Sequence, residues 1–467
     1  MKFFSALRKP AIIKRKNSVA ATEISESNSS RSNSGSTSPR IPSTPVSLAQ
    51  STNSSVSQIN FQEISEDVIV SSIPMMKIIT SQIDKIYYES NTEENNWICT
   101  VPEQEDRQIL KISLIGTNIL LDLNDQTKTS ISIVKTFSTE SNVILLEDSI
   151  NFIEPEVRIS SAESNDVTTL QKVIALSIFE HFSVYKSLTG SLISSIGLRM
   201  PDINMILNSQ FNFKDWCDIY IPEEGWVRSW CHINKMSKRT DKYDPKGKYQ
   251  IKFYRTNKSN SPNSNANLIC YIPDSNHVQD IFFYNGEANE QRPIANPTNF
   301  LNNVKLIKLI GDVLYPEETP SLRSTSTSSS ITKQLISPKR DVSTKAVKPS
   351  KSSNFKTHKD GLLIRPIPHH GLSHFDAMIK FIIPMMDITR KYGRPKQFNA
   401  SINESNSLMF GLPKLPNTNY LKQSEIDQLI RDTTMEDITN DEIFSYSMNW
   451  IADFLKETYQ IDPERAS

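Results

Sequence analysis

The stretch Trp216-Cys-Asp-Ile-Tyr-Ile-Pro-Glu-Glu-Gly-Trp-Val-Arg-Ser-Trp-Cys-His-Ile233 decides how this sequence folds. Its two halves are rich in aromatic and β-branched residues, which favour strands. Between them, Glu223-Glu224-Gly225 is typical of a tight hairpin turn. The stretch therefore predicts two neighbouring antiparallel strands.

More strands follow this hairpin, and a helix follows them. Tyr249–Arg255 alternates apolar and polar residues, as expected for a strand with one wet face. Ser373 is a plausible N-cap for a helix that runs to about Arg390, and Pro384 should kink or interrupt it. The expected strands are Trp216–Ile221, Trp226–Ile233, Tyr249–Tyr254, Leu268–Ile272, Ile281–Tyr284, Val304–Leu309 and Leu362–Ile364.

Residues 61–200 repeat the same plan. A helical pattern over Ile73 to Tyr88 precedes a set of short strands. An amphipathic helix then begins at Asp166. The expected strands are Trp97–Val101, Ile109–Ile115, Asn118–Leu123, Ile131–Val134, Val143–Leu146 and Val157–Ser160. Short strands followed by one long helix predict an α+β unit, such as a small barrel closed by a helix.

Two segments have the composition of disordered chain. Residues 1–60 are Ser-rich and contain eight Lys/Arg against two Glu. Residues 318–358 are similar and interrupt the second strand set, so they predict a disordered insertion. Residues 399–467 predict a loop and two helices, Ser424–Arg431 and Asp441–Tyr459. The predicted domains are therefore 1–60, 61–200, 201–398 with its insertion, and 399–467.

Bulk composition restricts the class of function. The 52 basic and 52 acidic side chains give zero net charge, so no global field attracts nucleic acid. No apolar run is long enough for a transmembrane helix. The N-terminus, which lacks acids up to residue 22, suits a disordered tail, a mitochondrial presequence or a peptide that touches anionic lipid. The spacing of the four cysteines suggests no zinc or redox site, and we expect reduced thiols buried in strands: Cys99, Cys217, Cys231 and Cys270.

Several motifs in order resemble one known family. The hairpin at 216–233 resembles the opening of a pleckstrin-homology (PH) domain, and Phe375–Arg390 looks like the helix that plugs its barrel. The other motifs are Phe179–Ile193, residues 211–217, Val304–Gly311, Ile379–Pro384, Tyr392-Gly-Arg-Pro395 and Ser407–Pro413. Together they resemble the fungal PH-domain family that contains a factor associated with the Not complex, which is an mRNA deadenylase and transcription regulator, and the bud-neck paralogue of that factor.

This resemblance implies a fold and a function. The fold class is α+β, mainly β, with two PH-like barrels that are each closed by a C-terminal helix. The function is a non-catalytic adaptor or scaffold for other proteins, such as Not-complex subunits or cortical proteins, in the cytoplasm and at the bud neck or cell cortex. Neither direct nucleic-acid binding nor a cofactor is expected. The alternative is a peripheral protein that binds anionic phospholipid weakly and without specificity.

Basic residues near the first hairpin are the candidate contacts to lipid or to an acidic surface. They are Arg228, Lys235, Lys238, Arg239, Lys242, Lys246 and Lys248. Clustered Lys/Arg attract anionic membranes by about 1 kcal/mol each when they lie close to the surface. The hairpin loop itself is acidic, which argues against a specific inositol-phosphate pocket. The competing interpretation is a solvated loop balanced by Asp241 and Asp244.

The low-complexity segments contain candidate phosphorylation sites. Ser38, Thr44 and Ser337 precede prolines, and Ser18 follows a basic run that suits a basophilic kinase. Each phosphate would add close to two negative charges. Alternatively, these are unused residues in a Ser-rich tract.

No pattern indicates catalysis. The sequence has no phosphate-binding Gly-rich loop, no nucleophile elbow and no zinc-protease motif. His369, His370 and His374 lie close together, but three imidazoles without a fixed frame are a weak metal signal, so we expect a loop and a helix start.

Overall fold

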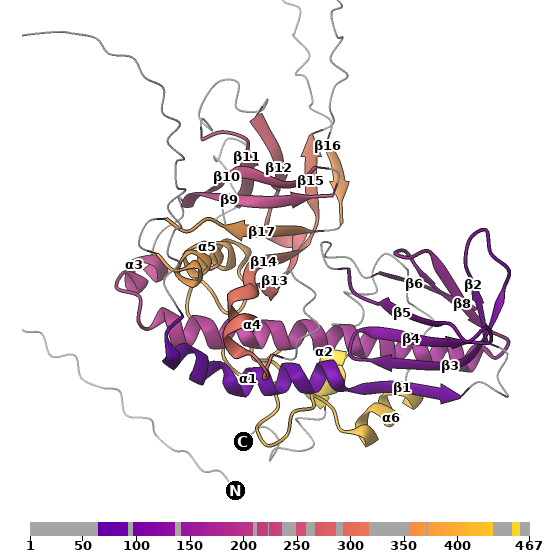
Figure 1. Ribbon diagram of the computed structural model, residues 1–467. Helices are drawn as coiled ribbons and strands as arrows, with labels where there is room; N and C mark the ends of the chain where they lie inside the picture. The colour runs from indigo at the N-terminus through magenta and orange to yellow at the C-terminus, as the bar shows by residue number, and fades with distance from the viewer. Residues whose placement is uncertain are drawn as a thin grey trace, which may run out of the picture. The chain divides into compact units, whose positions relative to one another are not determined.

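The computed structural model describes twelve stretches of the chain (Figure 1). They are residues 64–91, 97–135, 142–208, 213–222, 224–235, 249–257, 267–285, 293–316, 355–359, 361–369, 372–432 and 451–457. All of them belong to one compact unit, Ile59–Ser467. The expected disorder of residues 1–60 lies outside them, and the predicted domain boundaries stay a prediction.

The described chain is mainly β, with two curled antiparallel sheets and a few helices (Figure 1). The first sheet has the order β5-β4-β3-β2-β8-β7-β6, and β1 also pairs with β3. Its strands are β1 Ile86–Asn91, β2 Trp97–Thr100, β3 Arg107–Ile115, β4 Asn118–Leu123, β5 Lys128–Ser132, β6 Val143–Leu146, β7 Ser149–Phe152 and β8 Val157–Ser161. The predicted strands of this region are thus confirmed, except that β5 begins and ends earlier than the predicted Ile131–Val134, whereas β1 and β7 were not predicted.

The first helix begins and ends earlier than its periodicity suggested. Helix α1 spans Glu66–Asp84, and the extended backbone of Lys85 ends it. Tyr87 therefore lies in β1 rather than in the helix. Its hydroxyl donates a 2.5 Å hydrogen bond to Glu180 of α2, so tertiary contact overrides the local helical pattern here.

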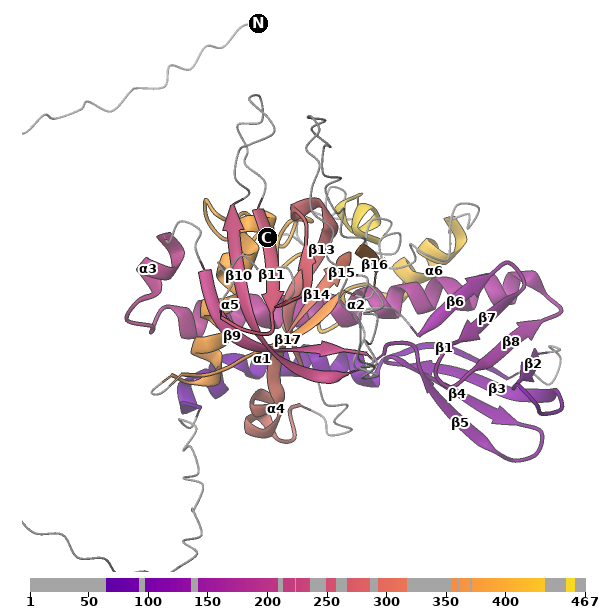
Figure 2. The same ribbon diagram turned by 90° about the horizontal axis from the view of Figure 1, so that it is seen from above.

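Helix α2, Ser164–Gly197, lies beside α1 and contacts elements of both sheets (Figures 1 and 2). Every residue from 170 to 189 is buried except His181, which is half-buried. A helix that is covered on all sides belongs to the interior of the fold. On one side Glu180 accepts hydrogen bonds from Lys85, and on another Lys186 pairs with Asp280. The helix that was expected to close only the first barrel therefore packs against both sheets.

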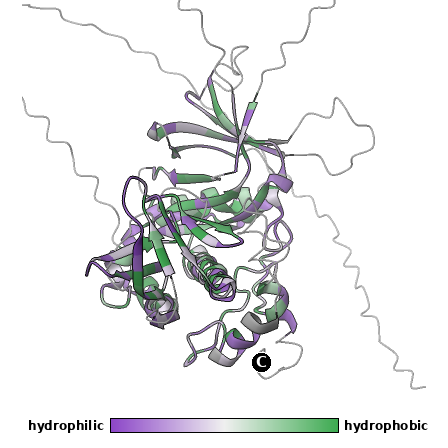
Figure 3. Ribbon diagram, turned by 90° about the vertical axis from the view of Figure 1, so that its right-hand side faces the viewer, coloured by the Kyte–Doolittle hydropathy of each residue, from purple (hydrophilic) through white to green (hydrophobic). Residues whose placement is uncertain are grey.

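The second sheet has the order β13-β14-β17-β9-β10-β11-β12-β15-β16. Its strands are β9 Phe213–Ile221, β10 Gly225–Lys235, β11 Tyr249–Tyr254, β12 Leu268–Ile272, β13 Val278–Asn285, β14 Val304–Gly311, β15 Val313–Pro316, β16 Phe355–His358 and β17 Leu362–Pro366. Short helices η2 (Ser275–His277), α3 (Ile203–Asn208) and α4 (Pro297–Asn303) flank it. Hydrophobic and hydrophilic residues alternate along several strands (green and purple in Figure 3).

Helix α5, His374–Thr389, packs on β13, β14 and β17 and closes this sheet, as predicted. Ser373 is its N-cap and forms a capping box with Asp376, which satisfies two backbone N–H groups of the first turn. Pro384 is buried inside the helix and does not interrupt it. The sequence therefore predicted the start of α5 correctly, and of the two effects expected of the proline the interruption does not occur.

The predicted insertion, 318–358, ends too late. Phe355–His358 form β16, which pairs with β15 immediately before the insertion. The ring of Phe355 also packs edge-on against Tyr271 of β12, with centroids 5.0 Å apart. The last four predicted residues therefore belong to the sheet, and residues 318–354 lie outside the described part.

The C-terminal region confirms one predicted helix. Helix α6 spans Gln423–Asp432. Residues 451–457 are also helical, and the rest of the expected helix at Asp441–Tyr459 lies outside the described residues. No helix in the described stretches combines the length and apolarity needed to cross a membrane.

Candidate interaction surface

The hairpin of β9 and β10 has a buried side and a partly exposed side. Cys217, Ile219, Cys231 and Ile233 alternate on the buried side. The intervening residues, joined by one residue of β17, form what we call the aromatic–arginine face: Trp216, Asp218, Tyr220, Trp226, Arg228, Trp230 and Arg365. Strand alternation, not a loop, therefore positions this surface.

The rings on this face stack across the strands. Trp216 opposes Trp230 and Tyr220 opposes Trp226 in the register, with edge-to-face centroid distances of 5.1 and 5.5 Å. Aromatic cross-strand pairs of this kind stabilise a sheet by about 0.2–1 kcal/mol each. The second strand of a PH-type hairpin would place Trp230 in the core, but here the residue is only partly buried and shares its side with Arg228 and Trp226.

Asp218 binds two arginines between the aromatic pairs. Its carboxylate accepts from Arg228 Nε at 2.6 Å and from Arg365 Nη2 at 3.1 Å. The guanidinium of Arg365 also lies over the Trp226 ring, 4.4 Å from the centroid. The two arginine side chains remain 60% and 41% exposed. The face thus presents oriented guanidinium groups beside tryptophans, although the sequence pointed only to Arg228.

The described arginines at the expected lipid site are already paired with carboxylates. Arg228 is already paired with Asp218, and at the hairpin turn Glu224 accepts from Arg255 at 3.1 Å. Lys235 ends β10, where its backbone pairs with Tyr249. The remaining basic candidates, Lys238, Arg239, Lys242, Lys246 and Lys248, lie outside the described residues, as do Ser18, Ser38, Thr44 and Ser337.

A basic row adjoins the aromatic–arginine face. His232 of β10 opposes Lys214 of β9 and Lys252 of β11. Burial, together with the weaker effect of the two neighbouring lysines, lowers the pKa of His232 to about 4. His232 is therefore neutral at physiological pH, while Lys214 is exposed and Lys252 is half-buried.

The same sheet has a second aromatic region that α2 covers. On this helix-covered face, Phe282 and Tyr284 of β13 pack against Phe182 and Tyr185 of α2, with centroid distances of 5.6 and 4.8 Å. Lys308 of β14 is fully buried between them. Its Nζ lies 4.3 Å from the ring centroid of Tyr284 and 4.8 Å from that of Phe182.

Lys308 is an unusual core residue. Within the described stretches, no hydrogen-bond acceptor reaches its ammonium group. Burial lowers its pKa to about 7, because the charged form loses its hydration. The sequence contained a signal that we did not use: Lys308 interrupts the apolar run Val304–Gly311, where a buried charge needs a special environment.

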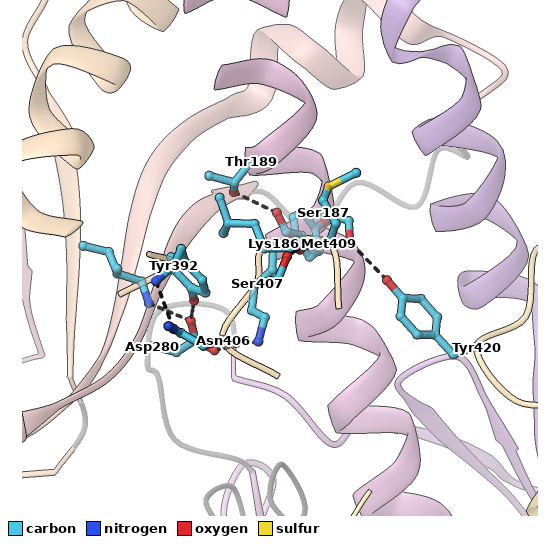
Figure 4. A network of polar contacts seen from close by, with 12 residues as sticks. Lys186, Ser187, Thr189, Asp280, Tyr392, Asn406, Ser407, Met409 and Tyr420 are labelled. Atoms are coloured by element: carbon cyan, nitrogen blue, oxygen red, sulfur yellow. Dashed lines mark hydrogen bonds and ion pairs between the residues drawn. The ribbon is translucent and has the colours of Figure 1, made fainter. Parts of the chain in front are cut away.

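A buried polar network extends this contact toward the C-terminal loop (Figure 4). Asp280 of β13 accepts from Lys186 of α2 at 3.1 Å and also from the Tyr392 hydroxyl. The Tyr392 amide donates to Asn406, and Ser187 of α2 bonds to the Leu408 carbonyl at 3.2 Å. The network therefore joins α2, the second sheet and the loop after α5.

Two of the motifs that resembled the family form the contact, which we call the seam, between α2, the second sheet and the loop after α5. In Tyr392-Gly-Arg-Pro395, Tyr392 reaches Asp280, while Arg394 forms a buried bidentate pair with Asp387 at 2.5 and 3.0 Å. Gly393 adopts φ +81°, and a Cβ there would lie 2.5 Å from a backbone carbonyl. In Ser407–Pro413, Met409 packs against Gly190 of α2. Both motifs are therefore structural.

The remaining candidate groups have structural positions. Each of the four cysteines is buried in a strand with a free thiol, as expected. His369 contacts Asp215 at 2.7 Å, and His374 begins α5. Across the part of the chain that the structure describes, no group of three or more His, Cys, Asp or Glu side chains is arranged to hold a metal.

Comparison with known proteins identifies the second sheet. The model of the fungal PH-like domain matches residues 199–410, which run from the end of α2 through the loop after α5. This range includes the aromatic–arginine face, the whole motif Tyr392-Gly-Arg-Pro395 and the first four residues of the motif Ser407–Pro413. The sequence-based prediction of a PH-like fold is therefore confirmed.

Two curated yeast proteins are similar over larger parts of the chain. The CCR4-NOT transcriptional complex subunit CAF120 of Saccharomyces cerevisiae is 24% identical over 272 residues, which cover 58% of this chain and 20% of CAF120. The uncharacterized protein YJL016W of Saccharomyces cerevisiae is 36% identical over 444 residues, which cover 86% of this chain and 78% of that protein. The chain therefore belongs to the family of fungal PH-like domain proteins that includes YJL016W.

Proposed function

We propose that this protein is a non-catalytic interaction scaffold that works with the CCR4-NOT complex. The observation that carries the proposal is the match to the fungal PH-like domain together with the similarity to CAF120, whose name makes it a subunit of that complex. CAF120 is much longer than the shared region, so the proposal concerns the function of the PH-like part.

The arrangement of polar groups supports a scaffold rather than an enzyme. The buried ion pairs Lys186–Asp280 and Arg394–Asp387 connect elements of the fold. The most unusual side chains at the surface are half-exposed Trp, Tyr and Arg, the residue types that are enriched in protein interfaces. We accordingly propose that this surface binds a partner. A location in the cytoplasm and at the cell cortex or bud neck is proposed as well, on the family resemblance of the sequence alone.

Affinity purification from yeast tests the proposal. A tagged full-length chain expressed in Saccharomyces cerevisiae should recover CCR4-NOT subunits above the level obtained with the tag alone, as measured by quantitative mass spectrometry. The matched control is the Gly393→Val variant, in which the new side chain would clash with a backbone carbonyl and disturb the seam after α5. Equal recovery by the wild type and the tag alone would overturn the proposal.

Weak binding to anionic membrane is the second candidate. Exposed Lys214 and the six basic residues of the 235–248 segment favour it, since that segment continues β10 directly in the sequence and contains only two acidic residues. The pairing of Arg228 and Arg255 with carboxylates disfavours a headgroup pocket. A liposome experiment that separates diffuse from specific binding is given in the Discussion.

A further inference from the structure

We propose that the aromatic–arginine face is the docking site for an acidic segment of a partner protein. The inference rests on the proposed scaffold function and names the chemistry of the partner at this surface. Carboxylates of the segment would pair with Arg228 and Arg365, and an apolar side chain would pack beside Trp226 and Tyr220.

The charges of the face select an acidic partner. Arg228 and Arg365, with Lys214 and Lys252 in the adjoining row, make four cations, and Asp218 is the carboxylate between the two arginines. Arg228 uses Nε for Asp218 and Arg365 uses Nη2. A guanidinium has five N–H donors, so each arginine keeps donors for a second carboxylate. Asp218 and the Trp226 ring hold the arginines in place, which reduces the entropy lost on binding.

The geometry of the aromatic rings favours a protein partner over a nucleic-acid partner. Bases stack on exposed aromatic faces. Here the Trp226 face is covered by the Arg365 guanidinium, and the Trp216–Trp230 and Tyr220–Trp226 pairs meet edge-to-face. Partly buried Trp, Tyr and Arg clusters are instead typical of the residues that dominate protein-binding energy.

The low-complexity segments of this chain are poor occupants. Residues 1–60 contain eight basic residues against two acidic ones, and residues 321–359 contain nine against one. Both would be repelled by the cations of the face. Neither of these two segments therefore supplies the acidic charge that the face requires.

The aromatic–arginine face is continuous with the helix-covered face, which packs against α2. Strand β17 lies between the two aromatic regions of the sheet. Its Leu363 is 1% exposed and pairs with Lys308 of the helix-covered face, whereas Arg365 pairs with Asp218. From Trp216 to Tyr220 the face extends along β9 for about 13 Å, enough for a short extended segment or roughly two turns of helix.

Phage display on the full-length chain provides the test. A library of random 12-residue peptides is selected against the wild type, and bound phage are counter-screened against Trp226→Ala/Arg365→Ala. We expect enrichment of peptides with net negative charge and an apolar residue, whose binding is lost in the variant. No enrichment, no acidic bias, or equal binding to the variant would overturn the proposal.

Fluorescence anisotropy with the most enriched peptide makes the test quantitative. Trp226→Ala/Arg365→Ala should weaken binding at least tenfold. Lys214→Glu/Arg228→Glu changes only exposed side chains, so it should fold normally and also weaken binding at least tenfold. The matched control, Tyr88→Ala/Arg158→Ala, removes a half-buried tyrosine and an Asp-paired arginine from the first sheet and should change binding less than twofold. An equal effect of the control would overturn the proposal.

Two further probes separate this inference from its rivals and from the proposed function. Phosphatidylserine vesicles and poly-uridine RNA are tested with the same variants, and tighter, face-dependent binding to either one would overturn the assignment to protein. If CCR4-NOT subunits co-purify equally with wild type and Trp226→Ala/Arg365→Ala, the docking proposal fails and the scaffold proposal stands. If acidic peptides bind this face but no CCR4-NOT subunit is recovered, the opposite holds.

Discussion

The two aromatic regions of the second sheet use similar side chains in opposite environments. On the helix-covered face, α2 buries Tyr284 together with the Lys308 ammonium and the Asp280 carboxylate. On the aromatic–arginine face, Trp226 stacks with an arginine that remains 41% exposed. The same side-chain types thus belong to the core where a helix covers them and remain available for binding where they are exposed.

The difference between the two faces is one of solvation. A buried ion pair that loses one partner leaves an uncompensated charge, whereas an exposed pair is replaced by water at little cost. Substitutions on the helix-covered face should therefore affect stability, and substitutions on the aromatic–arginine face should mainly affect binding. Matched variants of the two faces test this distinction.

The largest effect is expected at Asp280. Asp280→Asn removes the buried partner of Lys186 and weakens the Tyr392 contact, so it should lower the free energy of unfolding by about 3–5 kcal/mol. Asp218→Asn, the matched change on the other face, should cost about 1 kcal/mol or less. Urea unfolding at pH 7 measures both, and equal losses would contradict the comparison.

Lys308 should show an effect of opposite sign. Replacement of a buried charge by an apolar side chain of similar volume is often stabilising by about 1–4 kcal/mol, so Lys308→Met should raise the free energy of unfolding at pH 7. The Met side chain can keep the contacts to Phe182 and Tyr284.

The pH dependence of Lys308 follows from its lowered pKa. The folded-state pKa is about 7 and the unfolded-state value is near 10.5, so between these pH values the unfolded chain binds more protons. The free energy of unfolding of the wild type should therefore rise with pH in that window, relative to Lys308→Met. Parallel curves for the two proteins from pH 6.5 to 9.5 would show that Lys308 does not titrate there.

A smaller loss of stability is expected at Trp230. Because this ring is half-buried and packs edge-on against the half-buried Trp216, Trp230→Ala should cost about 1–2 kcal/mol, less than the roughly 3–5 kcal/mol typical of a buried tryptophan. Trp97→Ala in the fully buried core of the first sheet is the reference. If both variants lose the same stability, Trp230 is a core residue after all.

The sequence predicted local elements better than tertiary roles. The Trp216–Ile233 hairpin and the Ser373 cap depend on alternation and on one side-chain hydrogen bond, and both are present. Strand β16 was missed because its four residues are polar or lie in a basic segment, and only pairing with β15 makes them a strand. Periodicity along α2 could not show that both sheets would cover it.

The candidate site was predicted only in part for a similar reason. Arg228 was named because a PH-type hairpin often has a basic residue there, and the structure places it at the centre of the aromatic–arginine face. Asp218 and Arg365 are 147 positions apart in the chain, and their contact arises from the neighbouring positions of β9 and β17 in the sheet. Such pairs leave no signal in local spacing.

The smallest effect concerns membranes and tests the lipid alternative. Because Arg228 and Arg255 are paired with carboxylates, attraction to phosphatidylserine vesicles should come from the basic 235–248 segment and Lys214 rather than from a pocket at the hairpin. Such diffuse attraction is screened within about 8 Å at physiological salt. Sedimentation with vesicles is measured at about 50 and about 300 mM salt, on either side of physiological ionic strength. Binding should be lost at the higher salt and should change less than twofold in Arg228→Ala.

Neutralising Lys238, Lys242 and Lys246 to Gln should reduce low-salt binding more than Arg228→Ala does, since attraction falls with each cation removed. Salt-resistant binding to a single phosphoinositide isomer, abolished by Arg228→Ala, would instead mean that the Asp218 pair opens to receive a headgroup, and the aromatic–arginine face would then be a lipid site.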